Sequence, residues 1–170
     1  MVFFLVGLIF AALYLLGKYR HFKELDGYCA DSLSDIDAFL KRKYTAALTQ
    51  ARSMRSFSDE FGEIADELED MNFNGSFGIS DRNDAEVFLK DEVEKLNAAL
   101  SQKEQWRSST GYHEYAVNVR ACDTDIENAK EVYNETAAVY NRSVSRFPGS
   151  LLAKSLKLKK KELFVLKSDI

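Results

Sequence analysis

The chain opens with an uncharged apolar run that few environments can accommodate. Val2–Leu16 reads VFFLVGLIFAALYLL, and Gly17 extends the run without adding a charge. At 1.5 Å per residue a helix over this run spans about 24 Å, which is short of the roughly 30 Å hydrocarbon core of a bilayer. A short transmembrane anchor fits best, because Lys18 and Arg20 follow directly and can reach the interface with their charged ends.

We assign residues 1–17 to this anchor and residues 18–170 to one further domain. The anchor residues are Val2, Phe3, Phe4, Leu5, Ile9, Phe10, Leu13 and Leu16, with Lys18 and Arg20 at the inner edge. Two other interpretations stay open. A cleaved signal peptide would have a basic start and a small-residue cleavage site, and this run has neither. A helix buried in the core of a domain is the third interpretation.

The charges around the run predict its orientation. No lysine or arginine precedes it, whereas Lys18, Arg20 and Lys23 follow it. Because positive charge is retained on the cytoplasmic side, we expect the N-terminus outside and residues 18–170 in the cytoplasm. Cys29 and Cys122 would then be reduced thiols, and both fall on apolar stripes that would bury them.

Apolar residues spaced by seven predict long helices after the anchor. The first series is Leu33, Leu40, Ala47, Met54, Phe61 and Leu68, with Ile36, Phe57, Ile64 and Met71 in the second apolar position. This pattern predicts one helix from near Lys18 to Asp70. Asn72–Ser80 lacks periodicity and indicates a loop. Ser80 or Asp81 can cap a second helix, which should end near Trp106.

The third predicted helix has the most regular stripe in the chain. Its members are Tyr112, Val119, Ile126, Tyr133, Tyr140 and Phe147, with Tyr115, Cys122 and Ala129 in the intervening turns. Pro148-Gly149 should end this helix. Ser150 can cap a last helix that places Leu152, Leu156, Leu163 and Leu166 inside. We expect the aromatic stripe to be core and not a ligand-binding surface.

Such stripes are buried only when helices pack on one another. We therefore predict an all-α protein, with an N-terminal transmembrane helix followed by an elongated antiparallel bundle of three to four helices. Two long stripes exceed what the two shorter helices can cover. Apolar side chains should remain uncovered, and such patches mark contacts with other copies or partners.

Lys43 is the one basic residue on an apolar heptad position, alongside Ile36 and Ile64. A lysine at such a position needs a carboxylate or a route to water. Asp123 is the candidate partner, because it adjoins Cys122 near the seam of the long aromatic helix. The alternative is that the Lys43 ammonium reaches solvent.

Sequence patterns that carry chemistry are missing. The net charge of −4 argues against a bulk electrostatic grip on nucleic acid. His113-Glu114 lacks the second histidine of a zinc protease, and neither a glycine-rich phosphate loop nor a nucleophile elbow occurs. We therefore expect no enzymatic activity, no catalytic residue, no metal or cofactor, and no small-molecule substrate.

Three further features have two interpretations each. Asp59–Asp70 carries seven acids, which could form a divalent-cation patch or a solvated helix end. The C-terminal lysines could contact lipid headgroups or an acidic partner, or could form a solvated face; they are Lys154, Lys157, Lys159, Lys160, Lys161 and Lys167. The sequons at Asn74, Asn134 and Asn141 would be chance matches in a cytoplasmic domain.

Two blocks of sequence resemble the LemA family of bacterial membrane proteins. Residues 36–44 are similar to the family's IDxxLKRRY, through Ile36, Asp37, Leu40, Arg42 and Tyr44. The second block is similar to YNxxVxxYNxxxxxFPxxxxA, through Tyr133, Asn134, Tyr140, Asn141, Phe147, Pro148 and Ala153, with Ile126 and Lys130 upstream. The resemblance implies a membrane-tethered antiparallel helical bundle at the inner (cytoplasmic) membrane, and it transfers no catalytic residue.

The function that we expect follows from three features of the sequence. It predicts a membrane anchor and a rigid helical bundle, and it contains no recognisable group of catalytic residues. We expect a non-enzymatic scaffold or interaction protein that contacts membrane lipid and associates with other copies or with other membrane proteins. The alternative is an accessory subunit or adaptor of a membrane enzyme such as a protease.

Overall fold

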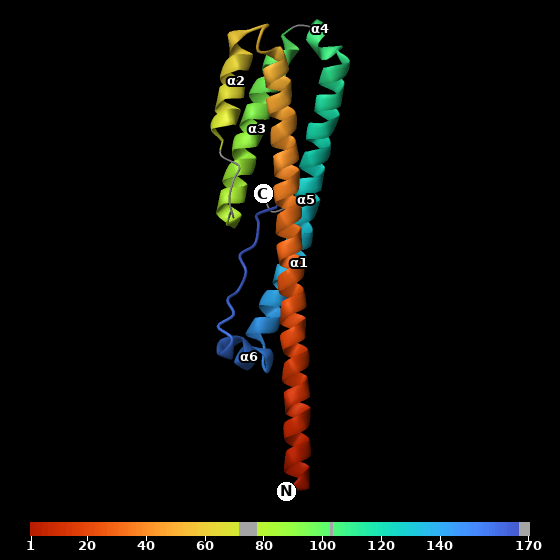
Figure 1. Cartoon of the computed structure of the whole chain (residues 1–170), viewed down its shortest axis with the longest axis vertical. Helices are drawn as coiled ribbons and strands as arrows, with labels where there is room; N and C mark the ends of the chain where they lie inside the picture. Colours follow the sequence, from red (N-terminus) through yellow and green to blue (C-terminus); the bar gives the residue numbers. More distant parts are fainter. Residues whose placement is uncertain (72–77, 103, 167–170) are drawn as a thin grey trace. The chain divides into compact units, whose positions relative to one another are not determined.

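The computed structural model describes residues 1–71, 78–102 and 104–166, with the side chain of Val2 also left out. Its helices are α1 (Val2–Met54), α2 (Asp59–Asp70), α3 (Ile79–Ser101), α4 (Glu104–Arg107), α5 (Thr110–Ser145) and α6 (Gly149–Ser155) (Figure 1). No strand occurs within these ranges. The predicted all-α class is confirmed.

The chain forms two compact units. Unit 1 comprises Met1–Ser34 and Lys130–Ile170, and unit 2 comprises Asp35–Ala129. The first part of α1 belongs to unit 1 and its second part to unit 2, whereas the first part of α5 belongs to unit 2 and its second part to unit 1.

Burial along α1 changes character at Phe22. Before this residue no side chain that the structure describes is buried. From Phe22 onward, buried positions recur every three or four residues, which is the period of a helix with one apolar face. They are Phe22, Leu25, Cys29, Ser32, Ile36, Leu40, Lys43, Ala47, Leu48 and Ala51. The series Phe22, Cys29, Ile36 and Lys43 thus extends the predicted second heptad position toward the N-terminus.

In unit 2, α2 packs against α3 and buries its own apolar stripe (Figure 1). The stripe is Phe61, Ile64, Ala65 and Leu68, and it faces a core with Leu89, Leu96 and Leu100 of α3. The Phe61 ring meets the Trp106 ring of α4 edge to face at 5.4 Å.

The predicted single helix from Lys18 to Asp70 is wrong, because the helix is interrupted between Met54 and Asp59. Ser58 adopts an extended conformation, and its hydroxyl accepts a hydrogen bond from the Glu60 amide at 3.4 Å. Asp59 and Glu60 then lie in the first turn of α2, where carboxylates are favourable. Phe57, predicted on an apolar heptad position, is exposed and lies beside the Trp106 ring.

The beginning of α3 also differs from the prediction. Gly78 is the N-cap, ahead of the predicted Ser80 or Asp81. The Asp81 carboxylate does contribute, because it accepts a hydrogen bond from the Gly78 amide at 2.8 Å. Most of the predicted Asn72–Ser80 loop, with the sequon at Asn74, lies outside the described residues.

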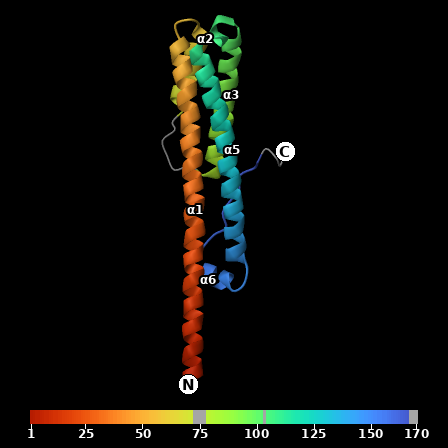
Figure 2. The same cartoon turned by 90° about the vertical axis from the view of Figure 1, so that its right-hand side faces the viewer.

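Unit 1 has a small core where α1, α5 and α6 meet (Figures 1 and 2). Its members are Phe22, Leu25, Tyr140, Val144 and Ala153, with Leu152 and Leu158 packed against them. The Phe22 and Tyr140 rings lie 6.5 Å apart in an edge-to-face arrangement. The prediction that Tyr140 is core is confirmed.

The end of the aromatic stripe was predicted wrongly. Val119, Ile126, Tyr133 and Tyr140 are buried, and Tyr112 is half-buried. Phe147 is 79% exposed, because α5 ends at Ser145 and the heptad register no longer holds beyond it.

The predicted last helix ends much earlier than expected. α6 stops at Ser155, with Lys157 in a left-handed conformation (φ 54°). The Leu158 amide donates to the Ala153 carbonyl at 2.9 Å and the Lys157 amide to the Lys154 carbonyl at 3.2 Å, which is the bond pattern of a Schellman motif. Residues 158–166 are not helical, and Leu156 and Leu163, predicted inside, are exposed.

Candidate functional site

The residues predicted to form the anchor lie at the start of α1, and none of their described side chains is buried. Exposed fractions of their large apolar side chains run from 43% for Val6 to 92% for Phe3. The set includes Phe3, Phe4, Leu5, Ile9, Phe10, Leu13 and Leu16. Lys18 lies 6.0 Å from the Tyr14 ring centroid, and Arg20 is exposed. By length and composition α1 can cross a membrane, and none of its apolar window is buried in the structure.

Two asparagines of α5 hold the non-helical C-terminal segment of unit 1 by its backbone. The Asn141 side-chain amide donates to the Lys161 carbonyl and accepts from the Lys161 amide, at 2.8 and 2.7 Å. Asn134 makes the same pair of bonds with Phe164, both at 2.8 Å. Each asparagine thus satisfies both backbone polar groups of one residue, as a neighbouring strand would.

The spacing of the two asparagines matches the spacing of their partners. Seven residues of helix rise about 10.5 Å. Three residues of extended chain cover about 10 Å. Asn134 and Asn141 therefore meet Phe164 and Lys161 in register, with the segment running antiparallel to α5. Along the segment, Leu158, Lys161 and Phe164 face inward with a period of three.

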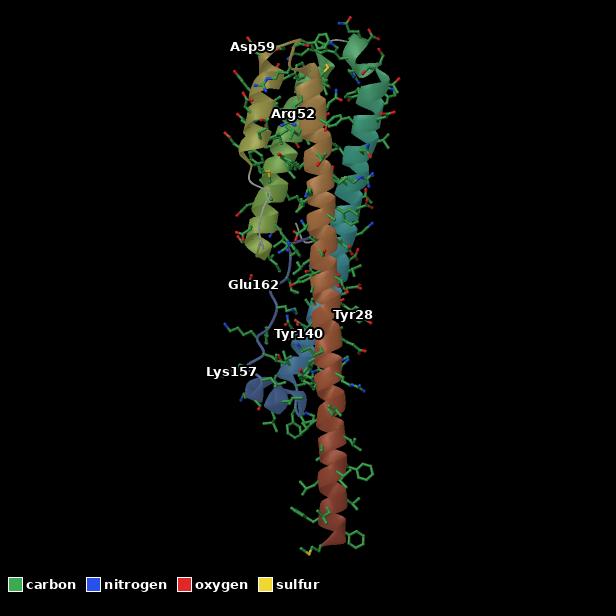
Figure 3. All side chains as sticks on the ribbon, in the orientation of Figure 1. Tyr28, Arg52, Asp59, Tyr140, Lys157 and Glu162 are labelled. Atoms are coloured by element: carbon green, nitrogen blue, oxygen red, sulfur yellow. The ribbon has the colours of Figure 1, made fainter. Side chains whose placement is uncertain are left out.

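Side chains add selectivity to these backbone bonds. Phe164 is buried against the Tyr133 ring at 5.3 Å, with the Lys130 ammonium 5.5 Å from its ring centroid. Lys161 lies 5.1 Å above the Tyr140 ring and forms a 2.7 Å ion pair with Asp26 of α1. The Tyr133 hydroxyl donates to the Glu162 carbonyl at 3.1 Å. Figure 3 labels Tyr140, Lys157 and Glu162 along this part of unit 1.

The electrostatic surroundings of Lys161 in unit 1 favour its protonated, positively charged form. Burial opposes this charge, but the hydrogen bond and attraction of Asp26 prevail and raise the pKa of Lys161. Burial raises the pKa of the nearby Cys29 thiol, which therefore stays protonated and unreactive at neutral pH.

In unit 2 the predicted ion pair of Lys43 is confirmed. The Lys43 ammonium donates to the Asp123 carboxylate at 2.7 Å. The Lys43 side chain is 2% exposed and that of Asp123 44%, so the carboxylate links the buried charge to solvent.

A second ion pair of unit 2 was missed by sequence reasoning. Arg82 of α3 binds both carboxylate oxygens of Asp37, with Nε and Nη2 each at 2.7 Å. Arg82 is buried. In the sequence it is one charged residue among several at the start of α3, and nothing there indicates that it is buried. Asp37 is part of the first sequence block, and this bidentate pair gives it a role in joining α1 to α3.

A groove of about 720 Å³ lies between α1 and α5 within unit 2. Small and polar side chains line it, among them Ala46, Thr49 and Gly111. Arg42 lies at this groove and donates to Asn118 at 2.9 Å. Tyr115 lines the groove, but its hydroxyl is buried, has no hydrogen-bond partner among the residues that the structure describes, and has a pKa raised by burial. The apolar spacing in the sequence gives no sign of this groove, because most of its lining residues are small or polar.

The seven acids of α2 are partly neutralised by basic side chains of unit 2. Arg52 binds Glu69 at 2.9 Å, Arg55 binds Asp66 at 2.8 Å, and Lys95 binds Glu67 at 3.1 Å. Within the described ranges no group of three potential metal ligands comes together. These contacts fit the interpretation of a solvated helix face.

The remaining residues of the two sequence blocks are structural. Ile36, Leu40 and Ile126 lie in the core, and Tyr44 and Pro148 are half-buried. Cys122 is buried in unit 2, where burial raises the pKa of its thiol.

Comparison with known proteins supports the reading of these blocks. The model of the LemA family matches residues 32–169, which is most of the chain. A comparison with curated proteins gives no match.

The Lys43–Asp123 pair should be measurable as a coupling energy. In a double-mutant cycle of Lys43→Met and Asp123→Asn, we expect a coupling of about 1 kcal/mol, within the 0.5–3 kcal/mol typical of contacting residues. The half-exposed carboxylate keeps the value at the lower end. Chemical denaturation gives the four stabilities. The exposed Lys90–Glu94 pair, 4.0 Å apart, is the control and should couple negligibly. Equal coupling in both cycles would contradict the role of the buried ammonium.

The side-chain hydrogen bonds of Asn134 and Asn141 should hold the C-terminal segment, residues 158–166, against α5. Replacement of Asn134 or Asn141 by leucine keeps helix propensity but removes both backbone bonds. We expect the Lys161 and Phe164 amides to exchange hydrogen faster in both variants, as measured by hydrogen–deuterium exchange with mass spectrometry. Asn128→Leu, at an exposed position of the same helix, is the matched control. Unchanged exchange of residues 158–166 in the Asn134 and Asn141 variants would show that other contacts hold the segment.

Proposed function

The chain belongs to the LemA family, and from this premise we propose that it is a non-enzymatic scaffold, anchored in a membrane and associating with other copies of itself. The observation that carries the proposal is the first part of α1, whose large apolar side chains are exposed all around the helix. Water is a poor solvent for such a surface, whereas a bilayer covers it completely.

The proposed orientation places the N-terminus outside and residues 18–170 on the cytoplasmic side of the inner membrane. Lys18, Arg20 and Lys23 support it, because they follow the apolar run closely and no basic residue precedes it. The protonated Cys29 and Cys122 thiols are compatible with a reducing compartment.

A scaffold role is supported by how the polar groups of the domain are engaged. Lys43 and Arg82 form ion pairs that join helices, and Asn134 and Asn141 hold backbone. These groups are unavailable for substrate chemistry while they hold the fold together.

Self-association is supported by the groove of unit 2. Its small side chains allow a helix from another molecule to approach closely. A membrane anchor raises the local concentration of neighbouring copies, so a weak contact suffices.

The orientation can be tested by labelling intact cells. A cysteine inserted after Met1 should react with a membrane-impermeant maleimide from outside. Thr124→Cys, at an exposed position of unit 2, should react only after permeabilisation. The native cysteines are buried and give little background. Reaction of the Thr124→Cys variant from outside would reverse the assignment.

Association can be tested by mass and by cross-linking. In detergent, light scattering should give a protein mass that is a multiple of 19.3 kDa, and cross-links in native membranes should join copies. Thr49→Arg, at an exposed position in the groove, should shift the protein toward monomer. Val87→Arg, exposed on α3 and outside the groove, is the matched control.

Three outcomes separate the alternatives. A monomeric mass without cross-links would contradict self-association. A stoichiometric enzyme in the cross-linked complex would favour the accessory-subunit alternative. Equal effects of Thr49→Arg and Val87→Arg would show that the groove is not the contact.

A further inference from the structure

The turn around α6 in unit 1 exposes large apolar side chains close together in sequence. Phe147 is 79% exposed and Leu151 60%, and Leu156 is exposed as well. Gly149 and Ala153 face the core, so Leu151 lies on the opposite side of the short helix. A surface with Phe147 and Leu151 on it is unfavourable in water and indicates a contact.

The same stretch is strongly basic. Residues 142–160 contain six basic side chains and no acid, and all six are exposed: Arg142, Arg146, Lys154, Lys157, Lys159 and Lys160. Apolar side chains among exposed cations are the pattern of segments that lie on anionic membrane surfaces.

The position of α6 along α1 fits such a surface. A side chain on Gly149 would place its Cβ 3.3 Å from the Phe22 ring and 2.5 Å from the Ser143 carbonyl oxygen, so α6 lies directly against Phe22. In Figures 1 and 2, α6 lies beside α1 at the end of α5 that is nearer the N-terminus of α1.

The distance from the anchor can be stated. Phe22 follows Gly17 by five residues, or about 7.5 Å of helix. The headgroup layer of one leaflet is about 5–8 Å thick, from the difference between total and hydrocarbon thickness. Phe22, and α6 against it, therefore lie at the level of the headgroups when residues 1–17 span the hydrocarbon core.

We propose that the Phe147–Lys157 turn is an interfacial membrane contact that recognises anionic lipid. Phe147 and Leu151 enter the boundary between headgroups and acyl chains, and Arg146 and Lys154 bind lipid phosphates. The proposal rests on the anchor proposed above. The two contacts, α1 through the bilayer and α6 on its surface, fix unit 1 relative to the membrane plane.

The inference can be tested on the full-length protein in lipid nanodiscs. Leu151→Trp reports on the turn, and Val132→Trp, exposed on α5 in the same unit, is the matched control. Trp106 contributes the same background to both. Lipids that carry a doxyl quencher near the headgroup end of the acyl chain should quench the Leu151→Trp emission and leave the Val132→Trp emission unchanged. Quenching should be greater in discs with phosphatidylglycerol than in discs of phosphatidylcholine alone.

Charge reversal completes the test. Lys154→Glu combined with Lys157→Glu should reduce the quenching of Leu151→Trp in anionic discs. If both tryptophan variants incorporate into discs but are quenched equally, this inference is overturned and the anchor is left intact. A blue-shifted Leu151→Trp emission without quenching would assign the turn to contact with another copy and would overturn lipid recognition. Failure to incorporate would overturn the anchor and this inference together.

Discussion

Helix α1 carries apolar side chains around its whole circumference up to Leu16 and on one face from Phe22 onward. A single helix therefore meets two kinds of surroundings, and the change falls within the few residues that include Lys18 and Arg20. The core of unit 1 begins at this change, because Phe22 is its first buried residue and contacts both Tyr140 and the backbone of α6. Packing of unit 1 thus depends on where the exposed part of α1 ends.

The C-terminal segment shows how unit 1 is closed without a further long helix. An extended segment instead turns every third side chain inward, which selects Leu158, Lys161 and Phe164. Asn134 and Asn141 replace the hydrogen bonds that a helix would have made internally. The two Tyr-Asn pairs are seven residues apart, and this interval sets the spacing at which α5 binds the extended chain. Each tyrosine is buried beside its asparagine.

Much of this arrangement could be predicted from the sequence, where periodicity and charge act together. The spacing of apolar residues gave the helices, and the misplaced Lys43 pointed to Asp123 because a buried ammonium has few possible partners. The break at Arg55–Ser58 was missed because the heptad register continues across it, although Ser58-Asp59-Glu60 is a helix-start pattern. The extended segment and the exposed Phe147 could not be predicted, since the Schellman turn at Lys157 has no glycine to mark it. The Asp37–Arg82 pair was missed because Arg82 lies in the polar first turn of α3, ahead of the predicted apolar stripe, so nothing marked it as buried.

Membrane insertion of the first part of α1 can be tested most directly by a spin-label scan along this helix in liposomes. Single cysteines from Phe3 to Leu33 would be introduced into full-length protein with Cys29 and Cys122 replaced by alanine, and accessibility to oxygen and to a water-soluble nickel complex would be measured. If this part of α1 spans the bilayer, oxygen accessibility should be high and nickel accessibility low at every position from Phe3 to Leu16. Beyond Lys18 we expect a helical period with minima at Phe22 and Leu25. Nickel accessibility with a helical period from Phe3 to Leu16 would contradict membrane insertion, because that part of α1 would then lie in water against another protein surface.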